Sequence, residues 1–175
     1  MPSPIGHALG GVAAGWAVAG APSAFPATRA AWWREVFGYA VLGMLPDADL
    51  LVGAHSGPTH GVGFALLVAV IVWLASHRRP RPAGSLRLAV ACGVAYASHI
   101  LLDWLGTDTS APIGIMALWP FSREYYQSGL QLFMAVSRRY WRPELFWWPN
   151  FLALIRELLI LVPVLVIVQR VRRRE

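Results

Sequence analysis

Two aspartates and two histidines lie close together in the segment LPDADLLVGAHSGPTHG, residues 45–61. Carboxylate oxygens and imidazole nitrogens are ligands of divalent transition metals such as zinc. Asp47 and Asp49 follow a proline, so we expect them in a turn, where a carboxylate can bind one cation or bridge two. The alternative is that these acids only cap the turn or the next helix. His55 and His60 flank a Gly-Pro bend, either as metal ligands or as solvated loop residues.

A second pair of candidate ligands lies in the sequence HILLD, residues 99–103. His99 and Asp103 are four residues apart, and a helix places such residues on one face, with Cβ atoms about 5–6 Å apart. The pair could share one metal ion, or could form a hydrogen bond that only steadies the helix. His7 has Gly and Ala neighbours, which leave room for another group to approach. Since an unpaired acid inside a bilayer costs about 2.5–3.5 kcal/mol, a divalent cation would supply the compensating charge.

The elements that must position these residues are strongly apolar. The chain has 175 residues, 57% of them hydrophobic, with a mean hydropathy of +0.50 and nine Trp. Soluble domains are about 45–50% apolar, and Trp favours membrane interfaces, so this composition indicates a membrane protein. We therefore predict one domain, residues 1–175, that forms an all-α integral membrane bundle of about four to five helices.

Five apolar runs are candidates for these helices. A membrane span needs about 20 apolar residues, which the fourth run meets, and the last is expected to be a C-terminal anchor over residues 145–170. The remaining stretches are predicted to be connectors. The runs cover residues 4–20, 36–53, 61–76, 86–105 and 145–169, and the connectors cover residues 21–35, 77–85 and 106–150.

Charge suggests how the bundle is oriented. All fifteen basic residues are Arg, and clusters at residues 78–81 and 170–174 flank apolar runs. This placement favours a topology signal and contact with anionic membrane lipids over nucleic-acid binding, which we do not expect. The positive-inside rule then puts both clusters, and the C-terminus, in the cytoplasm. The candidate ligands would all fall on the outer face of the cytoplasmic (inner) membrane.

The remaining signals exclude other kinds of site. Cys92 is the only cysteine, so an intramolecular disulfide is impossible and a cysteine-based zinc site is not expected. The N-terminal sequence has no basic residue before Arg29, and we therefore expect no cleaved secretory signal.

The order of these motifs resembles that of a known family. A leading His, then LPDAD, HSGPTHG, HILLD and LWPFS, is similar to the pattern of the YdjM-like membrane-bound metal-dependent hydrolases, over a motif core of residues 3–125. That family is usually placed with the all-α zinc-dependent phospholipases C and P1-type nucleases. The resemblance implies that the metal ligands are the following: His7, Asp47 or Asp49, His60, His99 and Asp103.

Two residues differ from the family pattern. The lack of further histidines after Asp103 also limits the number of metal ions that the chain could bind. Ser56 stands where Arg is usual, and Gly61 where Ser is usual. No His follows Asp103, whereas the soluble relatives have further ligands there. We therefore expect one or two divalent ions, zinc first and Mn, Ni or Fe as alternatives, rather than three.

The leading functional expectation is hydrolysis of an ester or phosphoester, in a small or lipid-like substrate, by a metal-activated water. Asp49 or His55 would act as the base, and Arg123 or a second metal would stabilise the oxyanion. Aromatic side chains near residues 119–126 could line a substrate pocket or form an ordinary interfacial belt. Two other functions stay open: a metal or proton transporter, and a non-catalytic scaffold stabilised by metal.

Overall fold

The described part of the chain folds into a bundle of five α-helices, with two short 3₁₀ helices between the second and the third. The computed structural model describes residues 1–19, 29–53, 55–76 and 82–172. No strand forms within these ranges, where only two isolated β-bridges occur. The helices are α1 (Pro4–Ala19), α2 (Arg29–Met44), η1 (Leu45–Val52), η2 (Pro58–His60), α3 (Val62–Ser76), α4 (Pro82–Trp104) and α5 (Pro143–Arg172).

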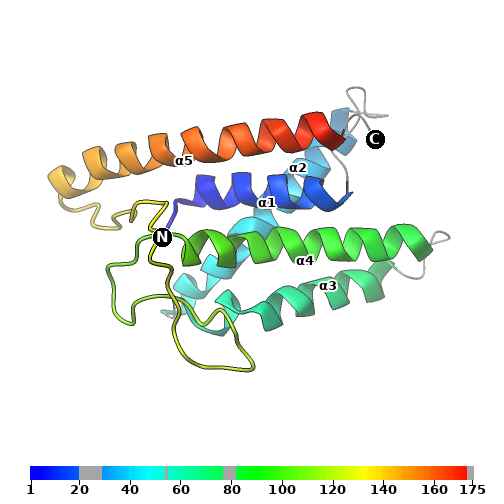
Figure 1. Ribbon diagram of the computed structural model, residues 1–175, viewed down its shortest axis with the longest axis horizontal. Coiled ribbons are helices and arrows are strands. Elements are labelled where there is room, and N and C mark those ends of the chain that lie inside the picture. Colours follow the sequence, from blue (N-terminus) through cyan, green and yellow to red (C-terminus); the bar gives the residue numbers. More distant parts are fainter. Residues whose placement is uncertain (20–28, 54, 77–81, 173–175) are drawn as a thin grey trace.

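Helix α1 lies in the middle of the bundle and packs against α2, α4 and α5, while α3 packs against α4 (Figure 1). The backbones of α1 and α2 touch where two glycines meet. A Cβ on Gly11 would lie 2.3 Å from the Tyr39 carbonyl, and one on Gly43 would lie 2.3 Å from the His7 carbonyl. Only glycine allows so close a crossing. The crossing brings the end of α2, and the acids that follow it, beside His7.

Residues 105–142 form a long segment without helices at the end of the bundle where α4 stops (Figure 1). One part pairs with the end of α4, where the Ser128 amide donates to the Trp104 carbonyl, and with the residue just after it, where the Leu132 amide donates to the Leu105 carbonyl. Another part lies against the turn that carries the histidines. There the Met116 amide donates to the Ser56 carbonyl, and the Val62 amide donates to the Ala117 carbonyl. This segment therefore packs around the turn at one end of the bundle.

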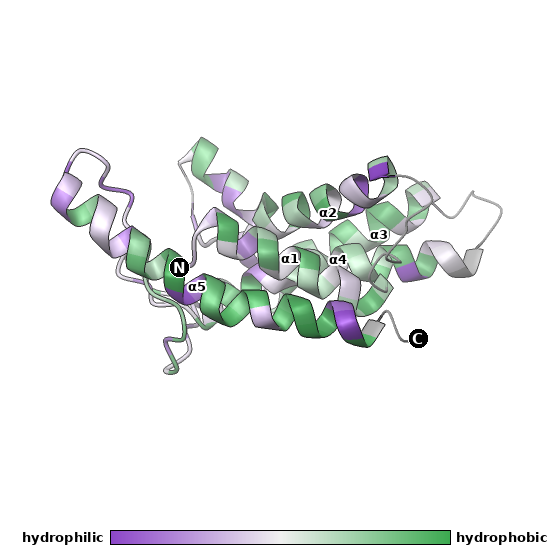
Figure 2. Cartoon of the chain, turned by 90° about the horizontal axis from the view of Figure 1, so that it is seen from above, coloured by the Kyte–Doolittle hydropathy of each residue, from purple (hydrophilic) through white to green (hydrophobic). Residues whose placement is uncertain are grey.

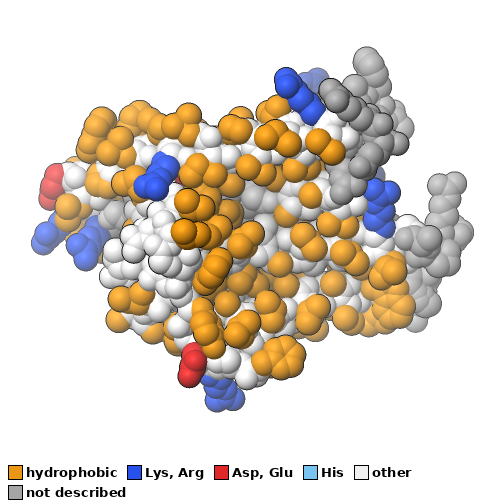
Figure 3. Space-filling view, in the orientation of Figure 1, with side chains coloured by type: hydrophobic (Ala, Val, Ile, Leu, Met, Phe, Trp, Pro, Cys, Tyr) orange, Lys and Arg blue, Asp and Glu red, His pale blue; other side chains and the backbone are white. Residues whose placement is uncertain are grey.

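Among the described residues, two helices are long and apolar enough to cross a membrane. They are Gly84–Trp104 within α4 and Pro143–Val171 within α5, whereas α3 is apolar but has only 15 residues. Apolar residues run along the helices of the bundle (Figure 2), and hydrophobic side chains cover much of the visible face (Figure 3). Only 17% of the apolar window of α5 is buried, so this helix presents most of its surface outward.

The predicted all-α bundle is confirmed, but some boundaries were wrong. The run 36–53 is two elements: α2 starts seven residues earlier, at Arg29, and the chain continues as a 3₁₀ helix from Leu45. The α-helix stops because the residue before Pro46 is disfavoured in the α conformation. Helix α5 begins at Pro143, so residues 143–150 are not a connector. The Arg residues at 78–81 and at 173–174 lie outside the described residues.

Candidate metal centre

Four side-chain atoms from three elements form a closed ring at the end of the bundle. The Asp47 Oδ1 lies 3.6 Å from the Nε2 of both His60 and His99. The Asp103 Oδ2 lies 3.5 Å from the His60 Nε2 and 3.0 Å from the His99 Nε2. Around a tetrahedral ion with ligands about 2.1 Å away, neighbouring ligand atoms lie about 3.4 Å apart. The four distances around the ring therefore suit the edges of a tetrahedral zinc site.

The His99 imidazole is oriented from behind by the backbone of α2. Its Nδ1 lies 2.7 Å from the Gly43 carbonyl oxygen, to which it donates a proton. This bond fixes the tautomer and leaves Nε2 unprotonated toward Asp47 and Asp103. Metal-binding histidines are commonly held in this way by a carbonyl or carboxylate. The expected pairing of His99 and Asp103 on one helix face is confirmed, with the i,i+4 contact at 3.0 Å.

The His60 imidazole is oriented in the same manner by Asp49. Its Nδ1 lies 3.3 Å from the Asp49 Oδ2 and 3.1 Å from the Thr59 hydroxyl, which itself donates to that carboxylate at 2.9 Å. The Tyr96 hydroxyl donates to the Thr59 carbonyl and ties this turn to α4. Asp47 is thus a member of the ring of ligand atoms, whereas Asp49 contacts the other nitrogen of His60, outside the ring.

His7, on α1, contacts the Asp103 carboxylate. Its Nε2 lies 3.3 Å from the Asp103 Oδ1, so the two oxygens of Asp103 face different imidazoles. The His7 and His99 rings are stacked, with centroids 3.7 Å apart. His7, Asp47 and His99 offer ligand atoms that lie within 4.8 Å of one another, as do His60, His99 and Asp103.

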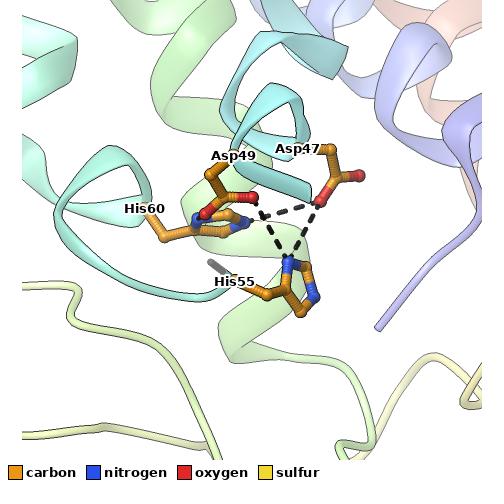
Figure 4. A group of neighbouring side chains, drawn as sticks. All are labelled: Asp47, Asp49, His55 and His60. Atoms are coloured by element: carbon orange, nitrogen blue, oxygen red, sulfur yellow. Dashed lines mark hydrogen bonds and ion pairs between the residues drawn. The ribbon is translucent and has the colours of Figure 1, made fainter. Parts of the chain in front are cut away.

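A second group of ligands is more open to the surface. Asp47, Asp49, His55 and His60 also offer ligand atoms within 4.8 Å of one another, and Figure 4 shows the His55 ring turned toward both carboxylates. The His55 Nδ1 lies 3.5 Å from Asp49 and 3.8 Å from Asp47. The side chains of His55 and Asp47 are 21% and 24% exposed, whereas those of His7, His60, His99 and Asp103 are at most 1% exposed.

The buried polar atoms of the centre lack ordinary partners within the described residues. Six of them make no hydrogen bond, although they lie close together, and buried polar atoms in proteins are nearly always hydrogen-bonded. A divalent ion would satisfy both the lone pairs and the negative charge, so the residues present fit a metal. The six atoms are both nitrogens of His7, the Nε2 atoms of His60 and His99, and both oxygens of Asp103.

The electrostatics of the turn also favour a cation. Burial opposes ionisation of Asp47 and Asp49, but their contacts with nearby imidazoles outweigh it and lower the pKa of both carboxyls. Burial likewise opposes protonation of His60, but Asp47 and Asp49 outweigh it and raise the pKa of this ring to about 9. In the metal-free protein a proton on His60 therefore provides part of the charge that a metal would supply.

The structure brings together the predicted ligands His7, Asp47, Asp49, His60, His99 and Asp103, and His55, expected as a ligand or as the base, lies beside them. Arg123 lies exposed on the long segment, and no contact between it and the cluster is found among the described residues. Its role in stabilising an oxyanion stays a prediction. Sequence reasoning missed Thr59, Tyr96 and the Gly43 carbonyl. Of these, only Tyr96 could have been found from the sequence, because its position three residues before His99 places both side chains on one face of a helix.

The packing of the long segment explains one difference from the family pattern. A Cβ on Gly61 would lie 2.7 Å from the Trp119 Cβ and 3.0 Å from the Met116 carbonyl. Residue 61 must therefore be glycine for the long segment to close on the turn. Ser56 is buried, and its backbone φ of 62° is unusual for a residue with a side chain.

Comparison with known proteins gives the following. The family model described as YdjM inner membrane protein matches residues 1–175. The chain is 35% identical to the inner membrane protein YbcI of Escherichia coli (strain K12) over 103 residues, which are 53% of this chain and 57% of that protein. The chain thus spans little more than half of the curated relative that it matches. No solved structure matches the chain.

Proposed function

Because this chain belongs to the YdjM inner membrane protein family, we propose that it is a membrane-bound, metal-dependent hydrolase of an ester or phosphoester. The observation that supports the proposal most is the ring formed by Asp47, His60, His99 and Asp103, whose edges of 3.0–3.6 Å suit a tetrahedral ion. We propose zinc as the metal, in one or two ions, and the outer face of the inner membrane as the location of the centre.

The chain's own residues divide between binding and proton transfer. A divalent ion in such a site lowers the pKa of a bound water to about 7 and polarises a carbonyl or phosphoryl oxygen. His55 lies at the exposed rim, with Asp49 3.5 Å behind its Nδ1, an arrangement that suits a general base held by a carboxylate. Asp47, which is partly exposed, lies on the side from which a substrate would enter.

An apolar groove supports a lipid-like substrate. The groove has a volume of about 380 Å³, within the range of about 300–1,000 Å³ that is common for ligand pockets. It lies between α3, α4 and the long segment, and one of its lining residues, Val62, follows His60 by two positions in the chain. Of the aromatic side chains expected in a pocket, only Tyr126 lines it. The full lining is Val62, Ala97, Ile100, Leu101, Trp104, Ala117, Leu118 and Tyr126.

The similarity to zinc-dependent phospholipases C and P1-type nucleases is part of this proposal and rests on the motif order alone. A transporter finds less support, because its binding residues would be expected near the middle of the helices, whereas this centre lies at one end of the bundle (Figure 1). A non-catalytic metal scaffold is the stronger alternative, since four buried or half-buried ligands also suit a closed structural site.

The test is hydrolysis by the purified, zinc-loaded full chain in detergent micelles. A panel of chromogenic carboxylic esters, phosphomonoesters and phosphodiesters serves as substrate, and a chelator serves as the metal-free control. We expect activity that the chelator removes, and that His55→Ala lowers about 10²–10⁴-fold. Glu124→Gln, on the exposed part of the long segment, is the matched control. Zinc binding without hydrolysis of any substrate class would favour the scaffold.

A further inference from the structure

Glu157 of α5 is a buried acid that the proposed mechanism does not use. Its side chain is fully buried, and the other buried acids of the described residues, Asp49 and Asp103, both belong to the metal centre. Glu157 also lies in a helix that is long and apolar enough to span a membrane. Ionisable groups in such segments are costly and commonly functional, so the contacts of this carboxylate require an explanation.

The carboxylate of Glu157 binds the start of α1. The Ser3 amide donates to its Oε1 at 2.7 Å, and the Ser3 hydroxyl donates to its Oε2. Ser3 in turn caps α1, because its hydroxyl accepts from the Gly6 amide at 3.2 Å and its carbonyl accepts from the His7 amide at 3.0 Å. The carboxylate thus satisfies donors at a helix start, where negative charge is favourable.

The contact of Glu157 with the start of α1 depends on Gly6, the residue next to His7. A Cβ on Gly6 would lie 2.7 Å from the Glu157 Oε2 and 3.0 Å from its Cδ. The following residue, His7, directs its Nε2 to Asp103. The first turn of α1 is therefore held between α5 on one side and the metal centre on the other.

We propose that Glu157 is a positioning residue for the metal centre, because it fixes the first turn of α1 and thereby places His7. A helix end frays unless its free amides are bound, and His7 lies only one turn inside. Loss of the carboxylate would let this turn move and withdraw the His7 imidazole from Asp103, one of the proposed ligands. The inference rests on the proposed function, since it gives α5 a role in the centre beyond that of a membrane anchor.

The experiment measures zinc affinity of the full chain by competition with a chromophoric chelator. We expect Glu157→Ala to weaken binding about 10–100-fold, as is usual for residues that orient a ligand. Ser3→Ala, which keeps the amide bond to Oε1, should cause a smaller loss, and it is informative if Glu157→Ala does not fold. Glu144→Gln, in the exposed first turn of the same helix, is the control and should bind zinc as the wild type does.

A double substitution separates positioning of His7 from a general loss of stability. In a His7→Ala background, Glu157→Ala should cause no further loss of zinc affinity, because the imidazole that it positions is absent. Exchange of the Gly6 and His7 amides, both of which bond to Ser3, should also rise in the metal-free Glu157→Ala protein. Unchanged affinity in folded Glu157→Ala, or equal losses with and without His7, would overturn the inference alone. A wild-type chain that binds no zinc would overturn the proposed function, and with it the role of Glu157.

Discussion

At the scale of single residues, the centre separates side chains that face the metal position from those that hold them. Asp47 and Asp103 offer oxygens to the Nε2 atoms of His60 and His99. Asp49 and the Gly43 carbonyl bind the opposite nitrogens of these two rings. The two aspartates of LPDAD, which the sequence does not distinguish, are thus placed differently: Asp47 faces the proposed metal position, and Asp49 contacts His60 and His55.

Asp49→Asn tests this division of roles. The substitution keeps the size of the side chain but removes the charge that holds the His60 Nδ1, and we expect zinc affinity to fall about 10–100-fold. Asp47→Asn removes a ligand oxygen and should cost more. Both are measured by chelator competition. If the two variants bind zinc equally well, the distinction between ligand and orienting residue is wrong.

The pH dependence of zinc binding is a second test at this scale. The pKa of His60 is raised from 6.5 to about 9 in the metal-free protein. Protonated His60 therefore stabilises the metal-free fold fully below pH 6.5, and this stabilisation is lost as the pH rises through 9. Zinc must displace that proton, so its apparent affinity should rise about tenfold per pH unit between these values. Titrations at pH 6.5, 7.5 and 8.5 check the slope, and a flat profile would contradict it.

At the scale of the elements, the lengths of the apolar runs and the spacing of HILLD predicted most of the bundle. The run 86–105 became α4, and the HILLD spacing placed His99 and Asp103 on one face because a helix fixes i and i+4 side by side. The start of α2 was missed because Trp32, Trp33 and Arg34 resemble an interfacial connector. The crossing of α1 and α2 at Gly11 and Gly43 could not be predicted, since it depends on tertiary packing.

The contact between the turn and the long segment yields a prediction at this scale. In Gly61→Ser the new side chain would overlap Trp119 and the Met116 carbonyl, and such overpacking costs about 1–3 kcal/mol. We expect a lower thermal unfolding midpoint and weaker zinc binding. Gly57→Ser, in the same turn but with no atom within 4 Å of its Cβ, is the control. Equal midpoints for the two variants would show that the segment does not close on the turn.

At the scale of the whole molecule, the centre lies at one end of the bundle, and α4 begins and α5 ends at the other (Figure 1). This arrangement agrees with the expectation that all ligands share one side of the membrane. The shared side was predictable because consecutive apolar runs cross the membrane in opposite directions, which returns the chain to the same side after every second run. Whether this side is the outer or the cytoplasmic face follows only from the distribution of Arg, and the outer face stays a prediction.

Cysteine labelling tests the orientation. Arg139 lies exposed on the long segment, four residues before α5 begins, and Arg170 lies exposed near the end of α5. We expect a membrane-impermeant maleimide to label Arg139→Cys in intact cells, and Arg170→Cys only after the membrane is permeabilised. The buried Cys92 of the parent chain is the background control. The reverse pattern would place the centre on the cytoplasmic face.

X-ray absorption spectroscopy of the zinc-loaded full chain tests the central claim most directly. Asp47, His60, His99 and Asp103 predict a shell of nitrogen and oxygen ligands about 2.0–2.2 Å from zinc, with imidazole scattering and no sulfur. His99→Ala should reduce the imidazole contribution by one ring and lower the bound zinc. A wild-type chain that retains no zinc after dialysis, or whose zinc shows no imidazole ligand, would contradict the account.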